Sequence, residues 1–133
     1  MTNRYSGQNF DKCQIETRAV HNGSEPDPLT GAMTNPIYQT ATYALEEVGV
    51  TKGYNYSRSI NPTVCALEKK LAGIENALGA KATRSGLAAT TVLVMALLKQ
   101  GDHIICTDVI FGGTIRLFSQ VLAKFGISIT YVD

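Results

Sequence analysis

The pattern of hydrophobic and polar positions changes near residue 60. Before that point the chain is rich in Gly, Pro, Asn, Asp and Thr, and turn signals interrupt it around residues 25–28. Periodic segments are few there, apart from a short helix predicted at residues 44–49. Because a long irregular segment is uncommon in a compact domain unless it has a function, residues 1–60 are interpreted as an extended arm that wraps a partner subunit.

From Asn61 onward the hydrophobic positions follow regular periods. Asn61 and Pro62 suit the cap and the first turn of a helix. The predicted apolar face of this helix comprises Leu67, Leu71, Ile74 and Leu78. Gly79 is expected to end it.

The remaining pattern alternates strands and helices. Strands are predicted at residues 80–84, 103–107 and 127–132. One helix is expected at residues 85–99, and a second begins at Gly112 and ends at Gly126. This order predicts an α/β fold with a parallel sheet and right-handed crossovers. Since the chain stops directly after a strand and leaves an open sheet edge, we expect it to be part of a larger enzyme.

Composition and charge narrow the class of protein. With 133 residues, 44% hydrophobic and 17% charged, the chain is typical of a globular α/β unit. A net charge of +1 gives no electrostatic basis for binding nucleic acid or a membrane surface. The apolar run at residues 87–98 is too short to span a bilayer. The odd set of 3 cysteines, without CxxC spacing, argues against disulfides and a zinc site and predicts a cytoplasmic location.

Tyr56 and Arg58 form the first candidate binding feature. A guanidinium matches phosphate geometry by bidentate hydrogen bonding. In an extended segment, residues two positions apart point to the same face. Tyr56 and Arg58 are therefore expected to grip one anionic group together.

Ser85, Gly86 and Leu87 form the second candidate feature. They follow a predicted strand and open a helix, whose N-terminal N–H groups suit a phosphate. Gly86 lacks a Cβ, so a ligand could approach the backbone closely. An ordinary Ser cap with a glycine turn is the commoner explanation of this tripeptide when it is considered alone.

Phe111 follows the next predicted strand and precedes two glycines. A planar aromatic at the carboxyl end of a strand can stack on a flat cofactor ring, although a core Phe before a glycine turn is the alternative. Neither GxGxxG nor GxxxxGK[ST] occurs, which disfavours a generic nucleotide-binding domain. His21 and His103 are isolated and are expected to be structural, and no cluster of residues predicts a metal.

These segments, in this order, resemble the N-terminal third of the pyridoxal-phosphate (PLP) enzymes of Cys/Met metabolism. That family includes cystathionine γ-synthase, the cystathionine lyases, methionine γ-lyase and O-acetylhomoserine sulfhydrylase. The segments that carry the resemblance are Thr17-Arg18-Ala19-Val20-His21, Thr30-Gly31-Ala32, Pro36-Ile37-Tyr38-Gln39-Thr40, Tyr56-Ser57-Arg58 with Asn61-Pro62-Thr63, Ser85-Gly86-Leu87-Ala88-Ala89, Gly101-Asp102-His103 and Gly112-Gly113-Thr114. The stretch at residues 52–54 and that at residues 113–118 look most like the cystathionine γ-synthase and γ-lyase branch.

The resemblance implies a fold-type-I, aspartate-aminotransferase-like PLP-binding domain. Residues 1–60 would be the arm that contacts a neighbouring subunit, and residues 61–133 the incomplete first part of that domain. The enzyme would be a homo-oligomer, commonly a dimer of dimers, with a small amino-acid substrate. The reaction would be β- or γ-elimination or γ-replacement on a sulfur amino acid or an O-acylhomoserine, in methionine biosynthesis or cysteine metabolism.

The resemblance also implies a role for each candidate residue. The cofactor-binding residues would be Tyr56, Arg58, Ser85, Gly86, Leu87 and Phe111. The backbone N–H groups of Gly86 and Leu87 would hold the cofactor phosphate. Tyr56 and Arg58 would reach the phosphate of the neighbouring subunit, and Phe111 would stack on the pyridine ring.

The chain departs from the family pattern in three ways. Phe111 stands where Tyr is usual, so the stacking ring lacks a hydroxyl, and Arg84 stands at a position that is usually small. The Schiff-base lysine is not expected in this chain, because none of its lysines has a Ser/Thr-x-Thr-Lys setting. No catalytic residue is therefore assigned, and the chain alone is expected to be inactive. A non-catalytic truncated homologue that acts as an interaction module is the alternative.

Overall fold

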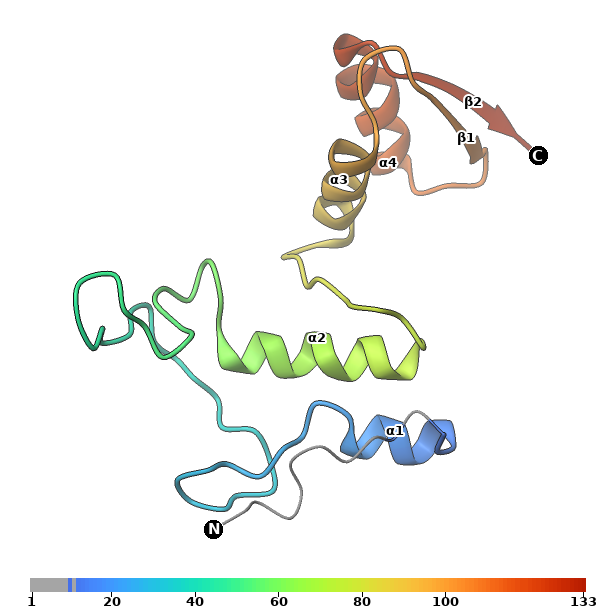
Figure 1. Ribbon diagram of the computed structural model, residues 1–133. Helices are drawn as coiled ribbons and strands as arrows, with labels where there is room; N and C mark the ends of the chain where they lie inside the picture. Colours follow the sequence, from blue (N-terminus) through green and yellow to red (C-terminus); the bar gives the residue numbers. More distant parts are fainter. Residues whose placement is uncertain (1–9, 11) are drawn as a thin grey trace. The chain divides into compact units, whose positions relative to one another are not determined.

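The computed structural model describes residue 10 and residues 12–133. Two compact units make up the chain, one running to Ala82 and the other from Thr83 to Asp133 (Figure 1). The first unit holds α1 (Ile15–His21) and α2 (Pro62–Ile74). The second holds α3 (Gly86–Leu97), β1 (His103–Thr107), α4 (Gly112–Arg116), the π-helical turn η1 (Leu117–Val121), the 3-10 turn η2 (Leu122–Phe125) and β2 (Ser128–Val132). The sequence predicts an arm at residues 1–60 that contacts a neighbouring subunit, and the first part of a cofactor-binding domain at residues 61–133. That division stays a prediction.

α2 begins where the sequence predicts and ends earlier. The Asn61 side chain accepts a hydrogen bond from the N–H of Thr63 at 2.9 Å, which confirms the cap. The helix stops at Ile74, so the prediction that Gly79 ends it is wrong. Asn76 adopts a left-handed backbone (φ 52°) that turns the chain away before Gly79, a conformation that Asn tolerates better than most residues.

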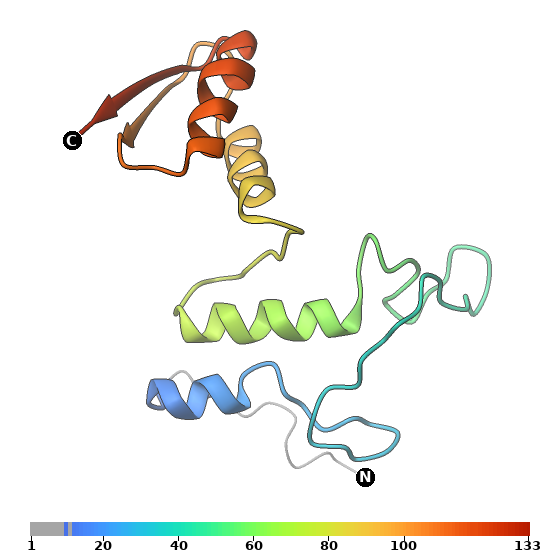
Figure 2. The same ribbon diagram turned by 180° about the vertical axis from the view of Figure 1, so that it is seen from behind.

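α1 was not predicted, and it packs alongside α2 (Figures 1 and 2). The Arg18 guanidinium donates to the carbonyl of Gly73 at 3.0 Å and to the side chain of Asn76. After α1 the chain turns at Gly23 (φ 69°), where a Cβ would lie 2.5 Å from the carbonyl oxygen of Ala66. Because the turn approaches the α2 backbone so closely, glycine is required there.

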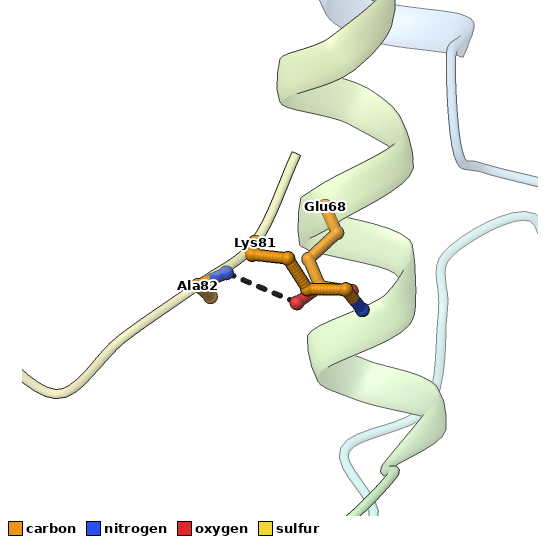
Figure 3. A network of polar contacts seen from close by, with 3 residues as sticks. All are labelled: Glu68, Lys81 and Ala82. Atoms are coloured by element: carbon orange, nitrogen blue, oxygen red, sulfur yellow. Dashed lines mark hydrogen bonds and ion pairs between the residues drawn. The ribbon is translucent and has the colours of Figure 1, made fainter. Parts of the chain in front are cut away.

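Two predicted elements are wrong. Residues 44–49 form no helix but end in a turn, in which the N–H of Val50 donates to the carbonyl of Glu47 at 3.0 Å. Residues 80–84 are not a strand. Their backbone is bound by a side chain instead, because the N–H of Ala82 donates to the Glu68 carboxylate at 3.0 Å (Figure 3).

The second unit confirms the predicted parallel arrangement for two strands. β1 and β2 pair in parallel, with a register that runs from His103 opposite Ser128 to Thr107 opposite Val132. The helical segment between them ends at Gly126 (φ 74°), as predicted. The helices and strands of this unit enclose an apolar cluster of Val94, Phe118, Leu122 and Ile127. The unit therefore has a hydrophobic core of its own.

Candidate functional site

Tyr56 and Arg58 lie in contact with each other. The Arg58 guanidinium donates a hydrogen bond to the Tyr56 hydroxyl, and its central carbon lies 5.0 Å from the centre of the Tyr56 ring. The backbone is not extended here, so that part of the prediction is wrong. The N–H groups of Ser59 and Ile60 both donate to the Tyr56 carbonyl at 3.0 Å and close a turn. The turn brings the phenol and the guanidinium together.

A short antiparallel contact fixes the backbone of this turn. Tyr56 forms an isolated β-bridge with Thr42. On either side of the bridge, the N–H of Tyr43 donates to the carbonyl of Asn55 at 3.1 Å and the N–H of Ser57 donates to the carbonyl of Ala41 at 2.9 Å. The backbone between Tyr56 and Arg58 is therefore held at several points, while the Arg58 side chain stays exposed.

The N-terminus of α3 begins with a Ser cap followed by a glycine. The Ser85 hydroxyl accepts from the N–H of Ala88 at 3.1 Å, which confirms the Ser cap. The N–H groups of Gly86 and Leu87 lie in the first helical turn, where no preceding helical carbonyl accepts from them. A Cβ on Gly86 would meet nothing within 4 Å, so the backbone is open to approach there. Arg84, just before the cap, is also exposed.

Phe111 is no core residue, because 74% of it is exposed. It caps α4, with its carbonyl accepting from the N–H of Thr114 at 2.8 Å. Its ring lies against Gly113, where a Cβ would collide with the ring edge. α3 and α4 begin at the end of the second unit toward which the strands point (Figures 1 and 2). Ser85, Gly86 and Phe111 therefore lie at the end where α/β folds bind ligands.

These residues fit a phosphorylated aromatic cofactor by their chemistry. The guanidinium of Arg58 and the hydroxyl of Tyr56 are donors suited to a phosphate. The open helical N–H groups at Gly86 and Leu87 are donors of the same kind. Phe111 presents an exposed flat ring. Tyr56 and Arg58 belong to the first unit, and the other candidates to the second.

His103, His21 and Lys81 have structural contacts. The His103 ring lies 2.8 Å from the Thr130 hydroxyl, and the His21 ring stacks on Phe10. Hydrogen bonding and charge attraction from Glu68, 3.0 Å away, raise the pKa of Lys81. In the part of the chain that the structure describes, no group of three or more His, Cys, Asp or Glu residues could hold a metal ion. Nor is any described helix long and apolar enough to cross a membrane.

Two further features of the first unit were not predicted. One is a cavity that Tyr38, Tyr54 and Cys65 help to line. Burial raises the pKa of Tyr54, and the nearby Cys65 adds to the shift. The other is a cluster of polar side chains around Asn61. Its sequence signal was the spacing of Ser57 and Asn61 four residues apart, which is too common a pattern to reveal a cluster.

Comparison with known proteins gives consistent results. The model of the family described as "Cys/Met metabolism PLP-dependent enzyme" matches residues 16–133. A probable cystathionine γ-synthase of Herpetosiphon aurantiacus is 50% identical over 117 residues, which cover 88% of this chain and 36% of that protein. A cystathionine β-lyase of Coxiella burnetii is 44% identical over 129 residues, which cover 96% of this chain and 33% of that protein.

Solved structures show the same likeness. The crystal structure of metB from Corynebacterium glutamicum superposes with a TM-score of 0.89 at 38% identity, over 95% of this chain and 33% of that one. A cystathionine γ-lyase of Lactobacillus plantarum, complexed with L-serine, superposes with a TM-score of 0.81 at 39% identity, over 90% and 31% of the two chains. The chain thus spans about one third of the length of these relatives. These likenesses confirm the predicted fold class.

Proposed function

The chain belongs to the Cys/Met metabolism family of PLP-dependent enzymes, and from this premise we propose that it supplies phosphate-binding and ring-stacking groups for PLP. The observation that carries the proposal is the contact of Arg58 with Tyr56, which puts a guanidinium and a phenol hydroxyl side by side on a backbone turn. Such a pair offers a phosphate several donors from one place. When bound, PLP supplies an electron sink for carbanion chemistry.

The second unit would contribute the other contacts. Gly86 and Leu87 would donate backbone N–H groups to a phosphate at the positive end of α3. Phe111 would lie against the pyridine ring of the cofactor. Gly113 leaves room for the Phe111 ring because it has no Cβ. Without a hydroxyl, Phe111 can hold the ring but cannot move a proton.

For the natural protein we propose a C–S lyase or transferase of transsulfuration. The substrate would be a sulfur amino acid or an O-acylhomoserine, undergoing β- or γ-elimination or γ-replacement. The support is the names of the relatives, which are cystathionine γ-synthases and cystathionine lyases. The protein would be a homo-oligomer in which Tyr56 and Arg58 act on the neighbouring subunit's cofactor. Cys13, Cys65 and Cys106 are all free, which supports a cytoplasmic location.

The chain by itself is proposed to be inactive, because none of its seven lysines has the Ser/Thr-x-Thr-Lys setting expected of a Schiff-base lysine. Lys81 donates to the Glu68 carboxylate at 3.0 Å, and this hydrogen bond raises the pKa of Lys81. Lys70 donates to the carbonyl of Val20 at 3.1 Å, and Lys52 lies 3.7 Å from Glu46. Each of these lysines has a structural contact in place of a catalytic setting.

The test of phosphate binding compares PLP with pyridoxal, which lacks the phosphate. In the natural protein freed of cofactor, Arg58→Ala is expected to weaken PLP binding by about tenfold or more, since a charge-assisted hydrogen bond is lost. Pyridoxal binding should not change. Arg116→Ala, which removes an exposed guanidinium from the end of α4, is the control. If Arg58→Ala weakens PLP and pyridoxal equally, Arg58 does not bind the phosphate.

The reaction itself is tested on the natural protein with cystathionine, and with O-acylhomoserine plus cysteine, following pyruvate, 2-oxobutyrate and cystathionine. An intact mass and a visible spectrum are recorded on the same sample. Turnover of one of these substrates with PLP bound supports the enzyme. An intact mass near 14.3 kDa without bound PLP would favour the interaction module instead.

A further inference from the structure

Asn61 is the one buried residue that the structure describes in the first unit, with 8% of its surface exposed. Its side-chain oxygen accepts from the N–H of Thr63 at 2.9 Å and so caps α2. Its side-chain nitrogen lies 3.1 Å from the carbonyl oxygen of Tyr38, 3.3 Å from the hydroxyl of Tyr43 and 3.0 Å from that of Ser57. Both the oxygen and the nitrogen of the Asn61 side-chain amide therefore have hydrogen-bond partners.

Capping needs only the oxygen of this amide. Ser and Asp cap helices about as well as Asn does, and they do it with an acceptor alone. A buried amide nitrogen is costly unless its two hydrogens find acceptors. The nitrogen of Asn61 meets three oxygens, none of which belongs to α2. Asn61 therefore ties other parts of the chain to the start of the helix.

Ser57 connects Asn61 to the proposed phosphate site, because Ser57 lies between Tyr56 and Arg58 in the chain. Its hydroxyl accepts from Asn61, lies 3.3 Å from the Tyr43 hydroxyl and donates to the carbonyl of Thr40. The backbone turn at Tyr56 is thus anchored through one side chain to both residues 40–43 and α2. A loose turn would let the phenol and the guanidinium separate.

We propose that Asn61 is a positioning residue for phosphate binding: its side-chain amide holds Ser57, and through Ser57 it keeps Tyr56 and Arg58 in place. The inference rests on the proposed function of Tyr56 and Arg58. A preorganised pair binds more tightly because less conformational freedom is lost when the ligand arrives. Asn61 does not touch the phosphate and acts only through the turn.

The test uses Asn61→Ser in the natural protein freed of cofactor. Serine keeps the cap oxygen and removes the amide nitrogen. We expect PLP binding to weaken by about fivefold to tenfold, the effect of losing one or two neutral hydrogen bonds that order the site. Pyridoxal binding should stay unchanged. Asn76→Asp is the matched control, since it changes an exposed Asn at the other end of α2 and keeps the oxygen that accepts from Arg18.

A double-mutant cycle decides whether the effect passes through Arg58. In the Arg58→Ala background, Asn61→Ser should weaken PLP binding by less than about twofold, because coupled residues are not additive. If Asn61→Ser leaves the ratio of PLP to pyridoxal affinity at its wild-type value, or acts fully in the Arg58→Ala background, the inference is wrong. If Arg58→Ala itself leaves that ratio unchanged, it is the proposed phosphate site that fails.

Ser57→Ala covers the case in which Asn61→Ser does not fold. This change removes the hydroxyl that joins Asn61 to the turn and leaves the cap of α2 intact. It should lower PLP affinity and not pyridoxal affinity, in the same direction as Asn61→Ser. An unchanged ratio in Ser57→Ala contradicts the inference.

Discussion

Different interactions stabilise the interior of each of the two units of this chain. The second unit buries four apolar side chains, and Leu122 is only 1% exposed. Among the described residues of the first unit, the buried side chain is the polar Asn61. The second unit is thus built on hydrophobic burial, whereas the first depends on hydrogen bonds and close backbone approach. Proposed cofactor residues in the first unit should therefore respond to polar changes, and those in the second to packing changes.

Large apolar side chains are exposed in both units. Leu29, Ile37 and Val48 are large and largely exposed. The proposed contact with a neighbouring subunit would cover surface of this kind. The second unit also exposes large apolar side chains, among them Leu97 and Val109, although it already has a core.

The largest effect is expected at the core of the second unit. Leu122→Ala should destabilise the natural protein by about 3 kcal/mol, because it removes buried methyl groups and leaves a cavity. Denaturant unfolding measures the loss, and hydrogen exchange of the β1 and β2 amides locates it. Val121→Ala, at a neighbouring position that is 44% exposed, is the control. Equal losses from the two changes would contradict the hydrophobic core.

The next largest effect is expected at the close approach in the first unit. Gly23→Ala should cost about 2 kcal/mol in total. About 1 kcal/mol comes from the left-handed backbone, and about 1 kcal/mol from overpacking, because a Cβ would lie 2.5 Å from the Ala66 carbonyl oxygen. Gly31→Ala is the control. Gly31 has a similar φ of 75° with nothing within 4 Å, so only the left-handed penalty of about 1 kcal/mol applies. Thermal unfolding of both variants tests the difference, and a Gly23→Ala loss no larger than that of the control speaks against close packing.

A packing change should also reach the proposed site in the second unit. Gly113→Ala would push the Phe111 ring aside, and PLP and pyridoxal should both bind about threefold to tenfold more weakly if stacking is lost. Gly112→Ala meets nothing within 4 Å and serves as the control. Absorbance titration measures the affinity of each of the two variants for PLP and for pyridoxal. If Gly113→Ala weakens the binding of PLP but not of pyridoxal, the position of the Phe111 ring affects binding of the phosphate and not of the pyridine ring.

The smallest effect is expected at the Glu68 contact (Figure 3). The N–H of Ala82, and then Lys81, lower the pKa of Glu68 below its ordinary value of 4.5. The folded state therefore gains stability from this carboxylate that is fully present above about pH 4.5. This gain is lost as the pH falls through the lowered pKa. Glu68→Gln should reduce that acid sensitivity when the denaturation midpoint is followed from pH 7 to pH 3, and an unchanged slope would contradict the contact.

Local signals in the sequence determined several elements of the fold. Asn61 and Pro62 start α2 because a cap oxygen and a missing N–H both suit a first turn. Gly126 ends the helical segment before β2 because it adopts the left-handed conformation at little cost. The ordered motifs also identified the family, which the match over residues 16–133 confirms.

Only the tertiary structure decided how the candidate site is held. The amide of Asn61 bonds to groups 23 and 18 residues away, at Tyr38 and Tyr43, and sequence spacing carries no record of such contacts. Residues 80–84 have the composition of a strand, yet Glu68 on α2 binds their backbone. The sequence placed Tyr56 and Arg58 near each other along the chain. A backbone turn, held through Ser57 and Asn61, placed their side chains in contact, because long-range hydrogen bonds outweigh local preference where no apolar core fixes the chain.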